Sequence, residues 1–333
     1  MSKMKPSPIT STIDFNKNGI QHGFLKLPYS RDDSAWGAIM IPITSIRNGD
    51  GPTALLTGAN HGDEYEGPIA LQKLALSLPV KDITGSVIIV PALNYPAFQA
   101  GTRTSPIDQG NMNRIFPGSP DGTVTEKIAD YFQRKLLPKA DYVLDIHAGG
   151  KTLDFVPFAA VHILKNKNQQ ARCVAAMQAF GAPYSLMMLE IDNVGMYDTA
   201  AEDMGKVFVS TELGGGGSAT RKSIEIAETG IKNLLIHAGI LSGEMKQRAT
   251  IQLDMPDDDC FITSTSSGLL EYCIDLSESV SVDDVICRVY DIEHTGIPPV
   301  EYKAKMDGIL TARHFPGLIK MGDCVAVLAI EVT

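Results

Sequence analysis

The feature that most constrains the fold is an alternation of short apolar runs with amphipathic helical segments between residues 53 and 241. Runs rich in β-branched residues predict strands, and apolar residues three or four positions apart predict helices. Such alternation builds parallel strands joined by helical crossovers. We therefore predict an α/β fold with a mostly parallel or mixed sheet flanked by helices. The expected strands are 53–58, 86–94, 141–150 and 206–217, and the expected helices are 67–79, 125–140, 168–181 and 221–241.

The segments on either side of this region have a β-rich character. Residues 1–47 contain short apolar runs separated by turns, and 37–46 is typical of a strand. After about residue 245 the chain has short β-rich runs and no long helical pattern. We predict one domain over residues 1–245, which includes the β-rich segment 1–47, and a smaller all-β domain over 246–333.

Two segments of the C-terminal region are similar to each other. Residues 268–290 and 308–329 each open with a glycine and place an aspartate, Asp284 or Asp323, just before a final apolar strand. This pattern resembles the two halves of a barrel-sandwich domain of the biotinyl/lipoyl type. Such domains carry a modified lysine in a tight hairpin, whereas Lys305 lacks both the flanking methionines and the hairpin position. We favour a structural or substrate-gating role for this region over a carrier role.

Charge and composition argue against several classes of protein. The chain of 333 residues has a net charge of −10, which gives no electrostatic basis for binding nucleic acid. Its first residues lack the apolar core of a signal peptide, and no run is long enough to span a membrane. Five widely spaced cysteines are typical of reduced thiols in a cytoplasmic protein. We expect a cytoplasmic protein whose partner is a small molecule, not nucleic acid or membrane.

Polar residues stand where three of the expected strands end. His61 and Glu64 lie in the stretch GANHGDEYEG, directly after the first strand. His147 ends the run YVLDIH, and Glu212 ends the run VFVSTE. Each residue alone could be a solvated turn residue or a strand-end group bonded to backbone. Because ligands collect beyond the carboxyl ends of strands in open α/β sheets, their joint placement predicts a functional site.

The residue types at this edge match a catalytic zinc site. Two histidines and a glutamate form the zinc ligand set of several hydrolases, and zinc lowers the pKa of the water that it binds. With His61, Glu64 and His147 as ligands, Glu212 is left to take a proton from water and pass it to a leaving amine. The glycines that follow, residues 214–217, let the backbone approach a substrate closely.

The loop 101–118 lies just after the second expected strand and should reach the same edge of the sheet. Asn113 and Arg114 offer donors for a substrate carboxylate, because a planar guanidinium binds a carboxylate with two hydrogen bonds. Arg103 offers a second cation, which could instead polarise the scissile carbonyl and stabilise its oxyanion. The alternative for Arg114 is a surface ion pair with Asp108.

Four motifs in order, GANHGDE, NMNRIFPG, DIHAGG and STELGG, resemble the succinylglutamate desuccinylase/aspartoacylase family, a branch of the zinc carboxypeptidase-like fold. This branch also carries a β-rich C-terminal domain. The resemblance implies one Zn2+ per chain, held by His61, Glu64 and His147. The further roles that it implies are general acid/base catalysis for Glu212 and contact with the substrate carboxylate for Asn113 and Arg114.

The chain departs from the DLNR motif of this family at one position. Asn111 stands where the family has an aspartate. We therefore expect the contact that this aspartate makes behind the metal ligands either to be lost or to be supplied by Asp108.

Over its full length, including the stretch QHGFLKLPYSRDDSAWG, the chain most resembles the bacterial deacetylases of ectoine degradation within this family. This resemblance implies hydrolysis of N2-acetyl-L-2,4-diaminobutanoate to L-2,4-diaminobutanoate and acetate. The γ-ammonium of that substrate needs an acid. The candidates for it are Glu190, Asp192, Asp198, Glu202 and Asp203.

Three alternatives stay open. The first is an aspartoacylase-like or desuccinylase-like deacylase, and the second is a carboxypeptidase, which would need an open cleft. The third is a non-enzymatic metal-binding or carrier protein, with a modified lysine between Tyr290 and Met306. The resemblance and a broad β-rich surface are compatible with a homodimer. We expect the remaining histidines to be ordinary residues, namely His22, His162, His237, His294 and His314.

Overall fold

The computed structural model describes residues 5–188 and 194–332, and its centre is a mixed β-sheet. Four neighbouring strands, in the order β5-β4-β6-β10, run parallel to one another. On one side β3 pairs antiparallel with β5, and on the other β8 pairs antiparallel with β10 and parallel with β9. The predicted mixed α/β sheet is therefore confirmed. The bounds are β3 (Ala38–Asn48), β4 (Thr53–Gly58), β5 (Gly85–Val90), β6 (Tyr142–His147), β8 (Phe158–His162), β9 (Tyr184–Met188) and β10 (Val207–Glu212).

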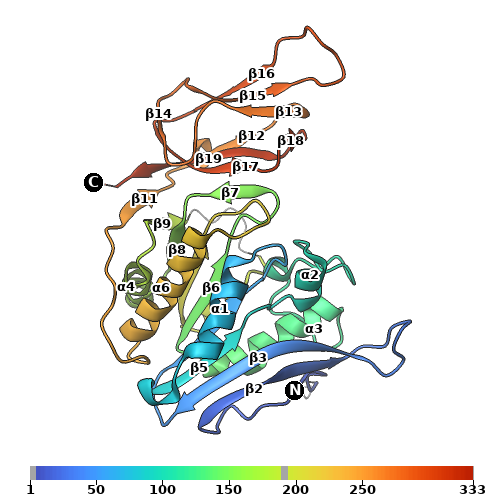
Figure 1. Ribbon diagram of the computed structural model, residues 1–333, viewed down its shortest axis with the longest axis vertical. Helices are drawn as coiled ribbons and strands as arrows, with labels where there is room; N and C mark the ends of the chain where they lie inside the picture. Colours follow the sequence, from blue (N-terminus) through green and yellow to red (C-terminus); the bar gives the residue numbers. More distant parts are fainter. Residues whose placement is uncertain (1–4, 189–193, 333) are drawn as a thin grey trace.

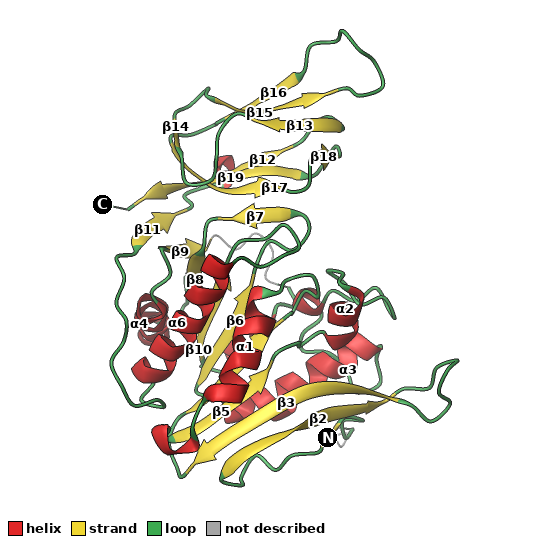
Figure 2. Cartoon of the chain, viewed as in Figure 1, coloured by secondary structure: helices red, strands yellow, loops and turns green. Residues whose placement is uncertain are grey.

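Helices cover both faces of this sheet (Figures 1 and 2). One apolar core contains residues of α1 (Glu66–Ser77), α4 (Lys167–Phe180) and α6 (Arg221–His237), together with strand residues that face them. A second core on the other face contains residues of α3 (Val124–Tyr131) and α5 (Tyr197–Asp203). Both faces of the strands are thus buried, as a parallel sheet requires.

The predicted helix 125–140 is helical as far as Lys139 but changes type along its length. The regular helix α3 is followed by a π-helical turn over Phe132–Leu136 and a 3-10 turn over Leu137–Lys139. Pro138 in the last turn lacks the backbone N–H that would continue an α-helix. Short helical segments also occur at α2 (Tyr95–Ala100), Val80–Asp82, Met112–Arg114 and Asp258–Cys260.

Local sequence signals explain the start and the packing of α6. The hydroxyl of Thr220 accepts a hydrogen bond from the backbone N–H of Ser223 (3.0 Å), which caps the helix. Gly230, in the middle of α6, faces the Phe180 ring of α4, and a Cβ there would lie 2.3 Å from that ring. The absence of a side chain at Gly230 therefore permits the close contact between the two helices.

The N-terminal segment forms an antiparallel extension of the sheet. β1 (Thr10–Ser11) pairs with β2 (Gly19–Pro28), which pairs along its whole length with β3. The loop 29–37 between β2 and β3 projects away from the body of the molecule (Figure 1). Trp36 in this loop is 99% exposed.

The C-terminal region is all-β, and its two similar segments exchange strands. β13 opens the first segment and pairs with β18 of the second, while β17 opens the second and pairs with β14 of the first. Asp284 and Asp323 fill equivalent turns, because each carboxylate accepts a hydrogen bond from the backbone N–H three residues earlier. The bounds are β11 (Ile251–Asp254), β12 (Phe261–Thr263), β13 (Gly268–Tyr272), β14 (Ser279–Val280), β15 (Val285–Tyr290), β16 (Val300–Lys303), β17 (Gly308–His314), β18 (Leu318–Ile319) and β19 (Cys324–Glu331).

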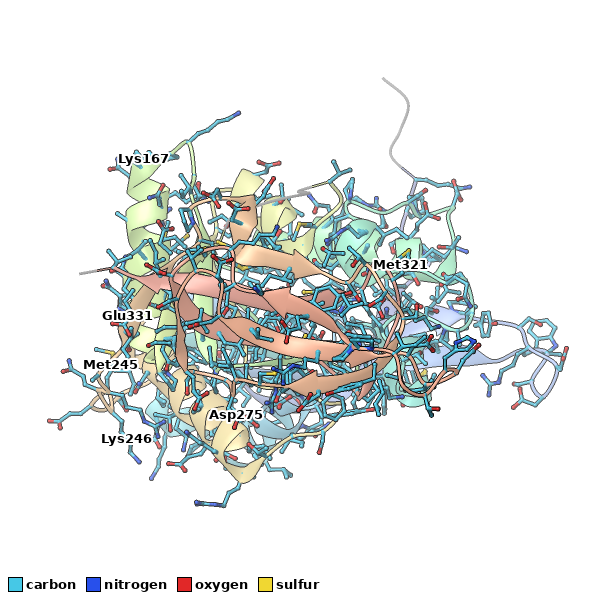
Figure 3. All side chains as sticks on the ribbon, turned by 90° about the horizontal axis from the view of Figure 1, so that it is seen from above. Lys167, Met245, Lys246, Asp275, Met321 and Glu331 are labelled. Atoms are coloured by element: carbon cyan, nitrogen blue, oxygen red, sulfur yellow. The ribbon has the colours of Figure 1, made fainter. Side chains whose placement is uncertain are left out.

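This β-rich region lies across the end of the α/β body (Figures 1 and 3). In Figure 3, Glu331 of β19 and Met321 before that strand mark its opposite ends. Strand pairing joins it to the body where β11 pairs parallel with β9 and where β17 pairs antiparallel with β7 (Leu153–Phe155). No helix in the described part of the chain is long and apolar enough to cross a membrane.

Candidate active site

His61, Glu64 and His147 meet at the carboxyl ends of neighbouring parallel strands. His61 and Glu64 lie in the loop after β4, and His147 is the last residue of β6. Nδ1 of His61 lies 2.8 Å from one carboxylate oxygen of Glu64, and Nδ1 of His147 lies 2.9 Å from the other. One atom of each residue lies within 4.8 Å of the other two, and all three side chains are buried. The arrangement can hold one metal ion.

Asp145 fixes the ring of His147. The Nε2 of His147 donates a hydrogen bond to Oδ2 of Asp145 (2.7 Å), which leaves Nδ1 as the nitrogen that faces Glu64. The carboxylate of Asp145 also accepts hydrogen bonds from the hydroxyl of Thr57 (2.6 Å) and the amide of Asn60 (2.8 Å). A carboxylate behind a histidine ligand selects the tautomer and raises the basicity of the ring.

Asn111 performs the corresponding task for His61. Nε2 of His61 donates to Oδ1 of Asn111 (3.2 Å), so the contact behind the metal ligands is present although the residue is not an aspartate. The expectation that Asp108 would supply this contact is wrong. Asp108 instead accepts hydrogen bonds from the backbone and hydroxyl of Thr125 in the first turn of α3 (2.7 and 2.8 Å).

The charges of these groups act strongly on one another. Burial opposes ionisation of Glu64, but the two histidines lower the pKa of its carboxyl overall. Burial also opposes protonation of His147, yet Asp145 and Glu64 hold the pKa of its ring well above the usual range. For His61, burial prevails and lowers the pKa. Glu64 is therefore held in its ionised form between the two rings.

Glu212 ends β10 directly beside His147, with which it forms a Cα pair in the parallel register. Burial and the negative charge of Glu64 raise the pKa of the Glu212 carboxyl to about 8. Among the described residues, Oε2 of Glu212 has no hydrogen-bond partner. A carboxyl group with these properties, next to a metal site, can exchange a proton near neutral pH.

The arginine loop reaches the same edge, as expected. A terminal guanidinium nitrogen of Arg103 lies 3.8 Å from Oε1 of Glu64, and its side chain is about half exposed. Arg114 donates to the backbone carbonyl of Asn113 (2.6 Å), and Oδ1 of Asn113 accepts from the backbone N–H of Tyr197 (3.0 Å). Because Oδ1 of Asn113 is engaged, Nδ2 is the atom that can donate to a carboxylate.

The glycines after Glu212 pack against protein, which differs from the expected approach to a substrate. A Cβ on Gly215 would lie 2.0 Å from the carbonyl oxygen of Leu153, and one on Gly217 would lie 2.7 Å from the side chain of Lys151. The backbone of Lys151 donates to Asp63 (2.8 Å), which lies between the two ligands of the first loop. These contacts tie the loops after β4, β6 and β10 together.

The candidate acids for a substrate ammonium divide into three groups. Glu190 and Asp192 lie outside the described residues, and Asp203 is exposed at the end of α5. Asp198 and Glu202 are buried on α5, on either side of the ring of His162. His162 therefore has two buried acidic partners, which the sequence did not lead us to expect.

Two residues with buried ionic partners were missed in the sequence, Asp145 and His162. Asp145 had a detectable signal, because residues two apart on a strand face the same side, so that Asp145 must lie beside His147. His162 had no such signal. Its acidic partners come from a helix more than thirty residues later, and only the fold brings them together.

Known proteins resemble this chain over its whole length. The family model described as "Succinylglutamate desuccinylase/Aspartoacylase catalytic domain" matches residues 50–238. A protein of Halomonas elongata named N-alpha-acetyl-L-2,4-diaminobutyric acid deacetylase is 56% identical over 329 residues, which are 98% of this chain and 96% of that protein.

Solved structures give the same result. A product-bound structure of the ectoine utilization protein EutE (DoeB) from Ruegeria pomeroyi has a TM-score of 0.97 and 64% identity, covering 98% of this chain and 99% of that one. A succinylglutamate desuccinylase/aspartoacylase structure from Rhodobacter sphaeroides has a TM-score of 0.93 and 36% identity, covering 98% and 100%. The likeness thus includes the β-rich C-terminal region as well as the α/β body.

Proposed function

The chain belongs to the succinylglutamate desuccinylase/aspartoacylase family of amide hydrolases, and from this premise we propose that it hydrolyses N2-acetyl-L-2,4-diaminobutanoate to L-2,4-diaminobutanoate and acetate. The observation that carries the chemistry is the meeting of His61, Glu64 and His147 beside the buried carboxyl of Glu212. The substrate is proposed from the name of the similar protein of Halomonas elongata, and a role in ectoine degradation from the name of the ectoine utilization protein of Ruegeria pomeroyi.

We propose that His61, Glu64 and His147 hold one Zn2+ per chain. The donor set fits this ion, because two imidazole nitrogens and a carboxylate oxygen are ligands that zinc accepts at a catalytic site. The hydrogen bonds from the opposite ring nitrogens to Asn111 and Asp145 also fit, since they direct both Nδ1 atoms to one point. When bound, zinc polarises the scissile carbonyl and makes water a stronger nucleophile at neutral pH.

The residues of the chain then divide the remaining work. Nδ2 of Asn113 and the guanidinium of Arg114 bind the α-carboxylate and thereby fix the position of the amide. Glu212 accepts a proton from the attacking water while the water oxygen bonds to the acyl carbon. Arg103 stabilises the negative charge that develops on the acyl oxygen. Glu212 then delivers the proton to the amide nitrogen, the C–N bond breaks, and acetate and the free amine leave.

The first test is acetate release from N2-acetyl-L-2,4-diaminobutanoate by the zinc-loaded protein, with N-acetyl-L-aspartate measured beside it. We expect a clear preference for the diaminobutanoate in kcat/KM. Preference for the aspartate would move the protein to the aspartoacylase alternative while keeping the hydrolase and its metal. Failure to release acetate from either compound, with zinc bound in a 1:1 ratio, would contradict the proposed function.

Three broader expectations remain proposals. A cytoplasmic location is supported by the cysteines, all five of which are free thiols. The division into a catalytic unit over 1–245 and a β-rich unit over 246–333 follows the change from α/β to all-β structure, although hydrogen bonds cross it at β9–β11. A homodimer is supported by the family resemblance and the broad β-rich surface, and sedimentation of the wild-type protein tests it.

A further inference from the structure

A second buried group of ionisable side chains lies between helix α5 and strand β8. His162 is the last residue of β8, and its Nδ1 lies 3.2 Å from both carboxylate oxygens of Glu202. Its Nε2 lies 4.0 Å from Oδ2 of Asp198. All three residues are buried: the exposed fraction is 5% for His162, 9% for Glu202 and 6% for Asp198. One imidazole thus faces two carboxylates in an enclosed place.

One carboxylate oxygen in this group has no hydrogen bond. Oδ1 of Asp198 accepts hydrogen bonds from the backbone N–H and the hydroxyl of Thr199 (2.5 and 3.2 Å). No donor within the described parts of the chain lies at hydrogen-bond distance from Oδ2, whose nearest cationic group is the His162 ring. Oδ2 therefore remains available to a donor that comes from outside the chain.

Asp198 lies on the same face of the sheet as Glu212. Side chains two apart on β10 point the same way, so Phe208, Ser210 and Glu212 share one face. Phe208 packs against Tyr197 of α5, with ring centroids 5.7 Å apart, which identifies this face as the one that α5 covers. Along β10, Ser210 and Glu212 are the two residues that are not fully buried. Ser210 and Glu212 are thus partly accessible on the face of β10 that α5 covers.

Asp198 is also held next to the residues proposed to bind the substrate carboxylate. The backbone N–H of Tyr197, one residue before Asp198, donates to the side chain of Asn113. The amine half of the substrate, anchored by its carboxylate at Asn113, would thus extend toward Asp198.

We propose that Asp198 binds the γ-ammonium of the substrate through Oδ2 and is the residue that selects a cationic amine over a neutral or anionic one. This inference rests on the proposed function, because it assigns one more contact to the same substrate. Glu202 has a different task. Its carboxylate pairs with the His162 ring. The negative charge of Glu202 is therefore already compensated within the protein, and Glu202 is not the group that needs a cationic substrate. A buried carboxylate opposite an ammonium forms a charge-assisted hydrogen bond.

The test compares two substrates that differ in a single group. N2-acetyl-L-2,4-diaminobutanoate carries the γ-ammonium, and N-acetyl-L-2-aminobutanoate has the same chain without it. In the Asp198→Asn variant we expect the ratio of kcat/KM between the two to fall about 10- to 100-fold, the loss typical of a hydrogen bond to a charged group. The change should appear mainly in KM for the cationic substrate.

Glu202→Gln is the matched control, since it removes a neighbouring buried carboxylate from the same helix. We expect its substrate ratio at neutral pH to stay close to that of the wild type. Zinc content and the thermal unfolding midpoint, measured for both variants, establish that each protein is folded and loaded.

The outcomes separate this inference from the proposed function. Equal loss for both substrates in Asp198→Asn, or loss of the ratio in Glu202→Gln alone, would overturn the role of Asp198 while leaving the deacetylase intact. A wild type that does not prefer the diaminobutanoate over the aminobutanoate would also overturn it. Failure of the wild type on every acylated substrate would instead remove the proposed function.

Discussion

The protein contains two buried groups of histidine and acid in opposite proportions. At the carboxyl edge of the sheet, two imidazoles share the single carboxylate of Glu64. Beneath α5, two carboxylates share the single imidazole of His162. The first arrangement offers nitrogen and oxygen lone pairs to one point, which suits a metal ion. In the second, Oδ2 of Asp198 has no hydrogen bond from a described residue, and this oxygen can accept one from an organic cation. The proportion of histidine to acid thus distinguishes the proposed metal site from the proposed ammonium site.

The largest expected effect comes from Glu212, which lies beside the first group and is proposed to transfer the proton, but is not one of the proposed metal ligands. We expect Glu212→Gln to lower kcat about 10²- to 10⁴-fold, because the variant can neither accept nor return the proton. Zinc binding should be unchanged, since Glu212 is not among the three ligands. Steady-state kinetics and metal analysis of the same preparation check this. A variant that turns over at the wild-type rate would remove Glu212 from the mechanism.

The next effect tests the residues behind the metal ligands. Asp145→Asn should weaken zinc binding about 10- to 100-fold, because the amide no longer accepts the hydrogen bond that orients His147. Competition with a chromogenic chelator measures the affinity, and excess zinc should restore activity.

A matched variant acts in the opposite direction. Asn111→Asp restores the family residue behind His61 and should strengthen zinc binding, because a carboxylate accepts the hydrogen bond from Nε2 more strongly. Asp198→Asn, in the second group, should leave zinc affinity as it is. Weaker zinc binding in Asp198→Asn would show that the two groups are not independent.

A smaller effect concerns pH and belongs to the second group alone. Burial raises the pKa of Asp198, the charges of His162 and His147 lower it, and Glu202 raises it. His162→Gln removes a positive charge that lowers the pKa of Asp198. In this variant the Asp198 carboxyl should therefore protonate at a higher pH, and its binding of the substrate ammonium should weaken as the pH falls. We expect KM for the diaminobutanoate to rise several-fold toward the acid end of a series from about pH 8 to pH 5.

Glu202→Gln provides the contrast, since it removes an influence that raises the pKa of Asp198. In that variant KM should stay low to a more acid pH than in the wild type. Identical pH profiles in the two variants would contradict the arrangement of charges around Asp198.

The smallest effect is on stability. Because burial raises the pKa of Asp198 above the value in the unfolded chain, its ionised form destabilises the fold above that pKa. Asp198→Asn mimics the protonated form and should raise Tm by a few degrees at neutral pH. Below the unfolded pKa, where both states of the wild type are protonated, the difference should vanish. A lower Tm in the variant at neutral pH would make Asp198 a stabilising residue instead.

The two groups also differ in how far the sequence alone predicts them. The metal ligands stand at the ends of strands with clear apolar patterns, so the topology of a parallel sheet was enough to bring them together. Asn111 was a different case, since the contact to His61 depends on the path of a loop that no periodicity describes. The group beneath α5 depends on β8, a strand of five residues that pairs antiparallel with β10. Its sequence has no alternation of apolar and polar residues that would predict a strand. Short strands and helices give too few residues for a periodic signal, and α5 was missed for the same reason.

The strand pairing at the rim of the site has a consequence for the time at which activity begins. β7, directly after the loop of His147, pairs with β17, and β17 pairs in turn with β19, which begins 177 residues after His147 (324 minus 147). At ordinary rates of translation this separation corresponds to about 10–35 s. A ribosome-bound chain therefore contains His61 and His147 long before β17 and β19, which pair with the strand that follows the loop of His147, have been synthesised. We expect hydrolysis to start only after β19 has been synthesised, so that growing chains do not act on substrate.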